Sequence, residues 1–202
     1  RGLVLVEDSG QSRGAGSSMR VFAIVVAYHP QEEKLSRLCE TLSGSGSRVI
    51  VVDNTETDSD GGESSMEFGT RIRSGENQGV ARAQNIGIAR ARELGAEVIT
   101  LFDQDSEPDA SFLGRMLAHV TPGVEGVWAP VCRDKTTNEE LPSFRLNGLK
   151  MASKVFSAGR TGPYAVDLVI ASGAVVTAVT FTVAGDMDED FFIDFVDFEW
   201  CL

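Results

Sequence analysis

The sequence predicts an α/β fold, in which an open, mostly parallel sheet is flanked by helices and a mixed second half follows. Three mainly apolar runs, at 21–27, 49–52 and 97–102, have the composition of strands buried on both faces. They alternate with segments of helical spacing, and such alternation is typical of parallel strands joined by right-handed crossovers. The alternation ends after residue 131, so we expect a less regular arrangement from there on.

The individual elements follow from the same patterns. The expected strands span residues 21–27, 49–52, 70–73, 97–102 and 124–131, and all but the short stretch at 70–73 are mainly apolar runs. The expected helices have apolar side chains three or four positions apart, and they span residues 32–42, 79–94 and 108–120. The helix at 79–94 has a small inner face of alanine and glycine, so we expect something to approach it closely. Residues 55–69 are polar and rich in Gly and Ser, which predicts a loop or a weak helix.

The second half and the two ends give weaker signals. Residues 133–163 are polar and irregular, two apolar runs follow at 165–171 and 174–179, and the last residues read as the opening of a helix. We expect one domain over 19–202, truncated at its C-terminal end, because the helical pattern stops abruptly. Met19 precedes the first strand, so we expect residues 1–18 to be a remnant ahead of the native start or a flexible tail.

Charge and cysteine usage narrow the functional classes. The formal net charge of −12 argues against a nucleic-acid-binding face, which would need clustered Lys and Arg. Cys39, Cys132 and Cys201 are scattered and odd in number, which predicts a reducing compartment and no zinc site. No apolar run approaches the roughly 18 residues of a membrane span. We therefore expect a cytoplasmic protein that is at most peripheral to the inner face of a membrane.

The most informative stretch is the strand at 97–102 with its polar continuation, Asp103-Gln104-Asp105-Ser106. The carboxyl end of a buried parallel strand opens into the crevice where such sheets bind ligands. Two carboxylates one residue apart concentrate negative charge there, and oxygen ligands suit Mg²⁺ or Mn²⁺ held together with substrate phosphates. Taken alone, the pattern is also explained by a polar loop that caps the next helix.

Polar groups follow the two preceding strands as well. His29 comes after the strand at 21–27, and Asp53-Asn54 ends the strand at 49–52. Each has a plain explanation by itself, as a loop histidine and as a turn or helix cap. Because the carboxyl ends of parallel strands lie at one edge of a sheet, we expect these groups to converge with Asp103 and Asp105 on one crevice.

Six segments in order, from about residue 21 to the end, resemble glycosyltransferase family 2. They are residues 25–30, 51–54, 76–88, 102–106, 171–174 and 190–200. The resemblance implies the GT-A fold, a Rossmann-like sheet flanked by helices. The Tyr-His-Pro, Asp-Gln-Asp-Ser and Phe-Ile-Asp-Phe-Val-Asp-Phe-Glu-Trp forms look most like the bacterial rhamnosyltransferase branch. That branch builds O-antigen and related surface polysaccharides from dTDP-L-rhamnose, with a glycan or lipid-linked acceptor.

The resemblance also implies roles for the strand-end residues. Asp53 would accept the imide N–H of the pyrimidine, Asp103 would face the ribose, and Asp105 would ligate Mg²⁺ or Mn²⁺ on the diphosphate. The small face of the helix at 79–94 would let the ligand approach the backbone. The remaining implied nucleotide contacts are His29, Asn77 and Gly79.

The terminal stretch 190–200 combines carboxylates with aromatic side chains that suit sugar rings. By its register Asp197 matches the family's base, which takes the proton of the acceptor hydroxyl during an inverting transfer. An acidic helix start beside the helix dipole would explain some of these carboxylates without catalysis. The implied contacts to the acceptor or the sugar are Ser172, Gly173, Asp194, Glu199 and Trp200.

Other functions stay open at this point. A non-catalytic nucleotide-sugar-binding module, or a transferase that uses another UDP or dTDP sugar, would carry the same motifs. A phosphatase of the haloacid dehalogenase type also has Asp-x-Asp at a strand end, but normally on its first strand. A phosphoacceptor signalling domain needs an acidic pair after the first strand, where this chain has Tyr28-His29-Pro30. Peripheral association with a membrane would need a segment beyond Leu202.

Overall fold

The computed structural model describes residues 3–6, 19–58, 61–133, 137, 139–141, 143–147, 150–154 and 163–202. The strands are β1 (Leu3–Val6), β2 (Val21–Ala27), β3 (Arg48–Glu56), β4 (Gly62–Met66), β5 (Gly69–Gly75), β6 (Val98–Asp103), β7 (Val127–Pro130), β8 (Ser143–Asn147), β9 (Lys150–Lys154), β10 (Tyr164–Val166) and β11 (Val175–Thr177). The helices are α1 (Glu32–Gly44), α2 (Val80–Glu93), α3 (Phe112–Leu117), α4 (Ala178–Ala184) and α5 (Val196–Cys201). None of these helices is long and apolar enough to cross a bilayer.

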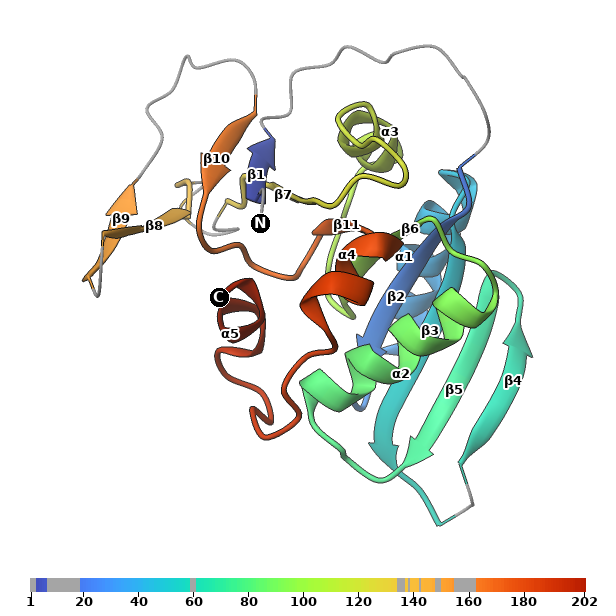
Figure 1. Ribbon diagram of the computed structural model, residues 1–202. Coiled ribbons are helices and arrows are strands. Elements are labelled where there is room, and N and C mark those ends of the chain that lie inside the picture. The colour runs from blue at the N-terminus through green and yellow to red at the C-terminus, as the bar shows by residue number, and fades with distance from the viewer. Residues whose placement is uncertain are drawn as a thin grey trace.

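Within the described residues, a nine-stranded sheet has the order β10-β1-β7-β11-β6-β2-β3-β5-β4. Its centre, β6-β2-β3-β5, is parallel, as the sequence predicts. The strand β11 enters antiparallel between β6 and β7, which gives the mixed second half that was also expected. Figure 1 shows helices on both faces of the sheet, with the β8–β9 hairpin standing off to one side.

The central strands are buried on both faces, so each contributes to two hydrophobic clusters. Ala23 and Val25 of β2 pack with Leu35 and Leu38 of α1. Neighbouring positions of the same strand, such as Ile24, pack on the opposite face with α2, α4 and α5. This explains why β2 and β3 read as continuous apolar runs rather than alternating ones.

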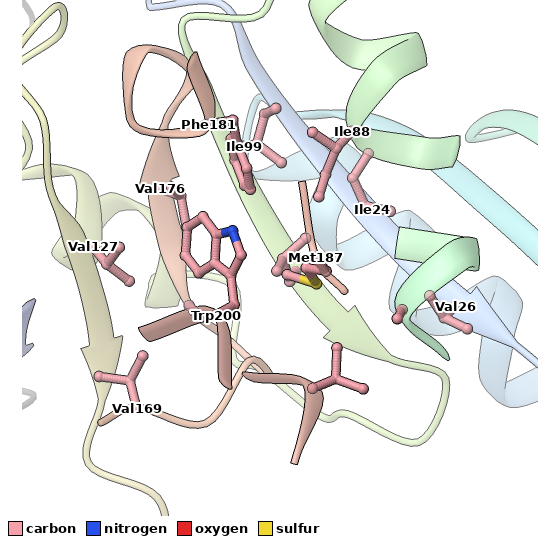
Figure 2. Close-up of a cluster of buried hydrophobic side chains, with 14 of the residues drawn as sticks. Ile24, Val26, Ile88, Ile99, Val127, Val169, Val176, Phe181, Met187 and Trp200 are labelled. Carbon is pink, nitrogen blue, oxygen red and sulfur yellow. The ribbon is translucent and has the colours of Figure 1, made fainter. Parts of the chain in front are cut away.

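The hydrophobic cluster on the α2 face extends into the second half of the chain. Figure 2 shows Phe181 of α4 and Trp200 of α5 beside Val176 and Ile99 of the sheet. The rings of Phe181 and Trp200 lie 5.0 Å apart. The C-terminal segment is therefore fixed to the same core as the parallel strands, and this fixes the position of α5.

The inner face of α2 is small because the helix lies directly on the sheet. A Cβ at Gly87 would overlap Cγ2 of Ile24 and come within 3.2 Å of Cγ2 of Val52. Ala83 and Ala91 are fully buried in the same cluster. The expectation that this face lets a ligand approach the backbone is therefore wrong, because close packing on the strands occupies it.

The loop or weak helix expected at 55–69 is also wrong. The strand β3 continues to Glu56, and β4 pairs with β5 in antiparallel register. The strand β4 lies at the edge of the sheet and is largely exposed, so most of its residues are polar or glycine. No alternation of apolar side chains therefore marks it as a strand in the sequence.

Residues 3–6 differ from the expected remnant or tail. They form β1, which pairs in parallel with β7 and antiparallel with β10. This short apolar run thus adds a strand to the sheet, while residues 1–2 and 7–18 lie outside the described residues.

Two further elements differ in their limits. The helix expected at 108–120 is confined to α3, and the apolar run at 174–179 divides into β11 and the start of α4. Thr180 accounts for the division, because its hydroxyl accepts a hydrogen bond from the N–H of Gly126, 2.9 Å away, and contacts the hydroxyl of Thr177. The irregular stretch expected at 133–163 contains β8 and β9, and part of it lies outside the described residues.

Candidate active site

Three neighbouring parallel strands, β6, β2 and β3, end at the same edge of the sheet. Gln104 links two of these ends. Its side-chain oxygen accepts the N–H of Tyr28 at 2.8 Å, and its amide donates to the Tyr28 carbonyl at 3.0 Å. The polar residues that follow β2, β3 and β6 therefore stand on adjacent strands, as their order along the chain predicts.

Asp103, Asp105 and Asp197 bring three carboxylates into electrostatic reach of one another. The pKa of Asp103 is raised, and the largest cause is that the surrounding protein limits the hydration of its carboxylate. Part of the residue is still exposed to solvent. The negative charge of Asp105, and then that of Asp197, raise the pKa further, while a hydrogen bond with Ser172 lowers it. We call Asp103, Asp105 and Asp197 the carboxylate cluster.

Asp197 is held in place by two backbone N–H groups. That of Ala171 donates to Oδ2 at 3.1 Å, and that of Phe198 donates to Oδ1 at 2.9 Å. Because Ala171 precedes Ser172, the first bond ties α5 to the loop that reaches Asp103. Phe195 precedes the helix with φ +63°, a left-handed conformation that is costly for a bulky residue and fixes where α5 begins.

Asp53 is buried and paired rather than open. It is 5% exposed, and the guanidinium of Arg71 lies 2.8 Å from Oδ2. The N–H of Thr55 donates to Oδ1 at 3.1 Å. Arg71 also contacts both carboxylate oxygens of Glu32 on α1, at 3.0 and 2.8 Å, and these bonds and the charge of Asp53 raise the pKa of Arg71.

Asn77 and Gly79 belong to a hydrogen-bonded turn before α2. The side-chain amide of Asn54 donates to Oδ1 of Asn77 at 2.9 Å and to the carbonyl of Gly79 at 3.1 Å. Gly79 has φ +81°, and a Cβ there would meet the Phe192 carbonyl oxygen at 2.6 Å. That oxygen also accepts the N–H of Val80, so the segment before α5 covers the start of α2 and the expected approach to Gly79.

The other expected site residues are spread more widely. Ser172 bonds Asp103 and lies 2.9 Å, oxygen to oxygen, from Ser106, whereas Gly173 is buried against Pro130 and Phe112. His29 is exposed with φ +44°, and its ring nitrogen lies 3.4 Å from Glu56. Asp194 is exposed, and Glu199 is partly buried on α5.

Trp200 does not fit the role of a sugar contact. It is 8% exposed, its indole N–H donates to the Gly185 carbonyl at 3.0 Å, and its ring packs on Phe181 (Figure 2). Both faces of this side chain belong to the core, so we assign it to the packing that positions α5.

The oxygen donors of the cluster fit a hard divalent cation. Asp103 and Asp105 come from one strand end, and the raised pKa of Asp103 reflects its limited hydration and then the negative charges of Asp105 and Asp197, which a cation would offset. No group of three or more His, Cys, Asp or Glu side chains in the described part of the chain is arranged to hold an ion by itself. Mg²⁺ sites commonly use one or two carboxylates together with substrate phosphates, which matches this donor set.

Comparison with known proteins identifies the family of the chain. The model of "Glycosyl transferase family 2" matches residues 23–167, which include most of β2, all of β3 and β6, and both carboxylates of the Asp-Gln-Asp segment. The chain belongs to glycosyltransferase family 2. Asp197 lies outside the matched range, so its assignment rests on register and on its place in the carboxylate cluster.

Two relatives illustrate the similarity. Over 185 residues the chain is 36% identical to a Shigella flexneri protein named dTDP-rhamnosyl transferase RfbF, a match that covers 90% of this chain and 62% of that protein. The fold resembles that of GalNAc-T7, crystallised with UDP, GalNAc and Mn²⁺, with a TM-score of 0.65 at 11% identity over 93% of this chain and 40% of the other. The expected GT-A fold is confirmed. The chain spans about three-fifths of the curated relative.

The sequence alone did not reveal the contacts that Arg71, Gln104 and Phe192 make. Arg71 lies in a strand that reads only as a short Thr-Arg-Ile-Arg run, and nothing local indicates that its guanidinium turns inward to Asp53. Gln104 stands inside the motif, but its pairing with Tyr28 depends on the adjacency of β2 and β6. Phe192 contacts Gly79 across more than a hundred residues of sequence, a contact that no periodicity reveals.

Proposed function

We propose that the chain is the donor-binding and catalytic part of an inverting rhamnosyltransferase that uses dTDP-L-rhamnose. The observation that carries the proposal is the carboxylate cluster, which brings Asp197 of α5 to the Asp103–Asp105 strand end. The similarity to a protein named dTDP-rhamnosyl transferase supports the choice of donor. The acceptor is a glycan or lipid-linked glycan of bacterial surface polysaccharide.

The nucleotide lies over the ends of β2 and β3. The Asp53 carboxylate lies beside Arg71, and a carboxylate that retains free lone pairs can accept the imide N–H of thymine or uracil. Cytosine has no N–H at that position, so a buried carboxylate facing it would lose about 1–3 kcal/mol. Asp53 therefore favours dTDP and UDP over CDP, with Asn77 and His29 as nearby polar groups.

Asp105, with Asp103 beside it, would hold Mg²⁺ or Mn²⁺ on the diphosphate. When bound, such a cation neutralises the charge that develops on the departing nucleoside diphosphate. The solved neighbour was crystallised with UDP and Mn²⁺, which supports the use of a divalent cation together with the nucleotide. In a chain of net charge −12, a cation also offsets the repulsion of the ligand's own negative charge.

Asp197 acts as the general base. Its carboxylate takes the proton of the acceptor hydroxyl while that oxygen forms a bond to the anomeric carbon. The bond from this carbon to the diphosphate breaks at the same time, and its electron pair leaves with dTDP. The N–H groups of Ala171 and Phe198 hold the carboxylate in a fixed orientation, which favours catalysis because no reorganisation is needed.

A panel of nucleotide sugars tests the proposal. The protein is incubated with Mn²⁺ and dTDP-L-rhamnose, UDP-glucose, UDP-N-acetylglucosamine or GDP-mannose, and release of the nucleoside diphosphate is followed with and without added glycans. We expect release from dTDP-L-rhamnose above the others. Binding of donors without release by any of them would favour the non-catalytic binding module instead.

The three free cysteines among the described residues support a reducing, cytoplasmic location. Peripheral attachment to a membrane is part of the same proposal, and sedimentation of the protein with vesicles tests it.

A further inference from the structure

A cavity lies beside the carboxylate cluster, on the flank of β6 that faces away from Asp53. It has a volume of about 370 Å³, in the lower part of the ~300–1,000 Å³ range of small-molecule sites. Ser106, Ser172 and Gly173 are among the residues that line it. Since Ser172 also bonds Asp103, the hydroxyl pair of Ser106 and Ser172 forms the wall between the cavity and the cluster.

The walls of the cavity are mainly apolar. They come from Phe102, Pro108, Phe112, Met116, Pro130 and Val131. The rings of Phe102 and Phe112 lie 6.0 Å apart, edge to face, so the cavity has a rigid aromatic side. Phe102 and Met116 are almost fully buried, which makes these walls part of the core rather than a mobile surface.

The two arginines among the described residues that line the cavity are each paired with a carboxylate. Arg115 is 17% exposed at its side chain and makes a two-point pair with Asp109, with nitrogen–oxygen distances of 3.0 and 2.6 Å. Arg133 pairs with Glu140 at 2.6 Å. The arginines among the described lining residues therefore offer no unpaired positive charge to an anion, and the neighbouring carboxylate cluster would repel one.

We propose that this cavity is the subsite for an uncharged sugar ring of the acceptor. Such a ring presents apolar C–H faces to the aromatic side and hydroxyl groups to Ser106 and Ser172. The inference rests on the proposed function, because an inverting displacement needs the acceptor on the side of the anomeric carbon opposite the leaving diphosphate. With the nucleotide over β2 and β3, that side is the flank of β6 where the cavity lies.

Cys132 offers a direct readout of occupancy. It lines the cavity and is partly buried, whereas Cys39 and Cys201 are 1% and 7% exposed. Burial raises the pKa of Cys39 to about 11, so this thiol stays protonated and unreactive at pH 8.5. Burial and the nearby charge of Asp103 also raise the pKa of Cys132, which makes its alkylation slow enough to time.

The test follows alkylation of Cys132 by iodoacetamide at pH 8.5, with modified residues located by peptide mass spectrometry. The probes are methyl α-L-rhamnoside, methyl α-D-glucoside and N-acetylglucosamine, with glucuronate and glucose 6-phosphate as charged counterparts. We expect at least one neutral sugar at tens of millimolar to slow the reaction about threefold or more, and the charged sugars to leave it unchanged. Equal protection by charged and neutral sugars, or none by any neutral sugar, overturns the proposal.

A second arm separates the donor from the acceptor. dTDP with Mn²⁺ should not slow Cys132 alkylation, since it occupies the other flank of β6. If dTDP-L-rhamnose protects Cys132 and free glycosides do not, the cavity holds the donor sugar and the acceptor assignment is wrong. If dTDP binds while no sugar protects Cys132, only the cavity proposal fails; if dTDP does not bind, the proposed function fails.

Two variants check the location independently. Val131→Trp, which fills the cavity, should abolish protection, whereas Val183→Trp, at an exposed position of α4, should not. Each variant is first compared with the parent by its melting temperature. If the Val131 variant does not fold, the chemical shift of the Met116 methyl group is measured in the parent protein instead, before and after adding the neutral glycosides. An unchanged shift counts against the proposal.

Discussion

The guanidinium of Arg71 lies 2.8 Å from Oδ2 of Asp53, and neither side chain is more than 11% exposed. The same guanidinium reaches Glu32 on α1, whose side chain is 66% exposed. Thus one cation joins β5, β3 and α1 directly below the position proposed for the pyrimidine. A buried charge is tolerated only when its partner is present.

Replacing Arg71 should therefore be far more costly than replacing Glu32. Arg71→Met leaves the Asp53 carboxylate buried and uncompensated, and we expect a loss of about 3–5 kcal/mol in the free energy of unfolding. Glu32→Gln removes only an exposed partner and should cost less than about 1 kcal/mol. Urea denaturation of the two variants measures the difference, and equal losses would contradict this view of the pair.

The packing of α2 gives a second prediction. Gly87→Ala forces a Cβ into Ile24, and overpacking of this kind costs about 1–3 kcal/mol even though alanine is the better helix former. Gly114→Ala in α3 is the matched control, because a Cβ there meets nothing within 4 Å and should stabilise by ~0.4–1 kcal/mol. Comparing the melting temperatures of both variants with that of the parent tests this prediction. A stabilised Gly87 variant would contradict it and would mean that α2 has room to move off the sheet.

The parallel centre of the sheet could be predicted from sequence because its signals are local. Strands such as β2 are buried on both faces and read as continuous apolar runs. The polar edge strand β4 is solvated and carries no such signal, and β1 is separated from its partners by more than a hundred residues. The apolar, β-branched composition of α4 favours a strand. The segment is helical instead, and the Thr180 hydroxyl in it accepts a tertiary hydrogen bond from the N–H of Gly126.

The candidate site divides in the same way. The positions of Asp53, Asp103 and Asp105 follow from the rule that parallel strands end at one edge. Their partners do not, since Arg71 and Ser172 reach them through tertiary contacts. Trp200 shows the limit of motif reasoning: its neighbour Asp197 joins the cluster, while the indole three positions on turns into the core.

The raised pKa of Asp103 predicts that replacing this residue with asparagine stabilises the fold to a degree that depends on pH. Its pKa is raised in the folded protein, so the ionised group destabilises the fold at neutral pH and protonation relieves this as pH falls. Asp103→Asn, measured without metal, should raise the melting temperature by less than ~4 °C at pH 7. The gain should shrink as the pH falls through the raised pKa towards the ordinary value of Asp.

Asp109 provides the opposite control. Its pKa is lowered, chiefly by hydrogen bonds with Arg115, so its ionised form stabilises the fold at neutral pH. Asp109→Asn should lower the melting temperature at pH 7, and the loss should disappear as the pH falls through the lowered pKa. Shifts of the same sign in both variants would contradict the assigned causes.

Asp197→Asn tests the general base. Loss of such a group typically slows the reaction by about 10²–10⁴. The asparagine oxygen can still accept the N–H of Ala171, so the loop and the binding of dTDP should be unchanged. Asp194→Asn is the matched comparison on the same segment and should retain more activity. Rhamnosyl transfer at close to the parent rate by the Asp197 variant would rule out this role.

Calorimetric titration with dTDP tests the central claim, that the end of β6 binds a nucleoside diphosphate together with a divalent cation. We expect binding to be at least about tenfold tighter in Mn²⁺ than in EDTA, a difference of ~1.4 kcal/mol. Asp105→Asn should lose most of that difference, whereas Asp186→Asn, at an exposed site near Arg92, should keep it. Equal affinities of the parent and the Asp105 variant in Mn²⁺ would contradict the account.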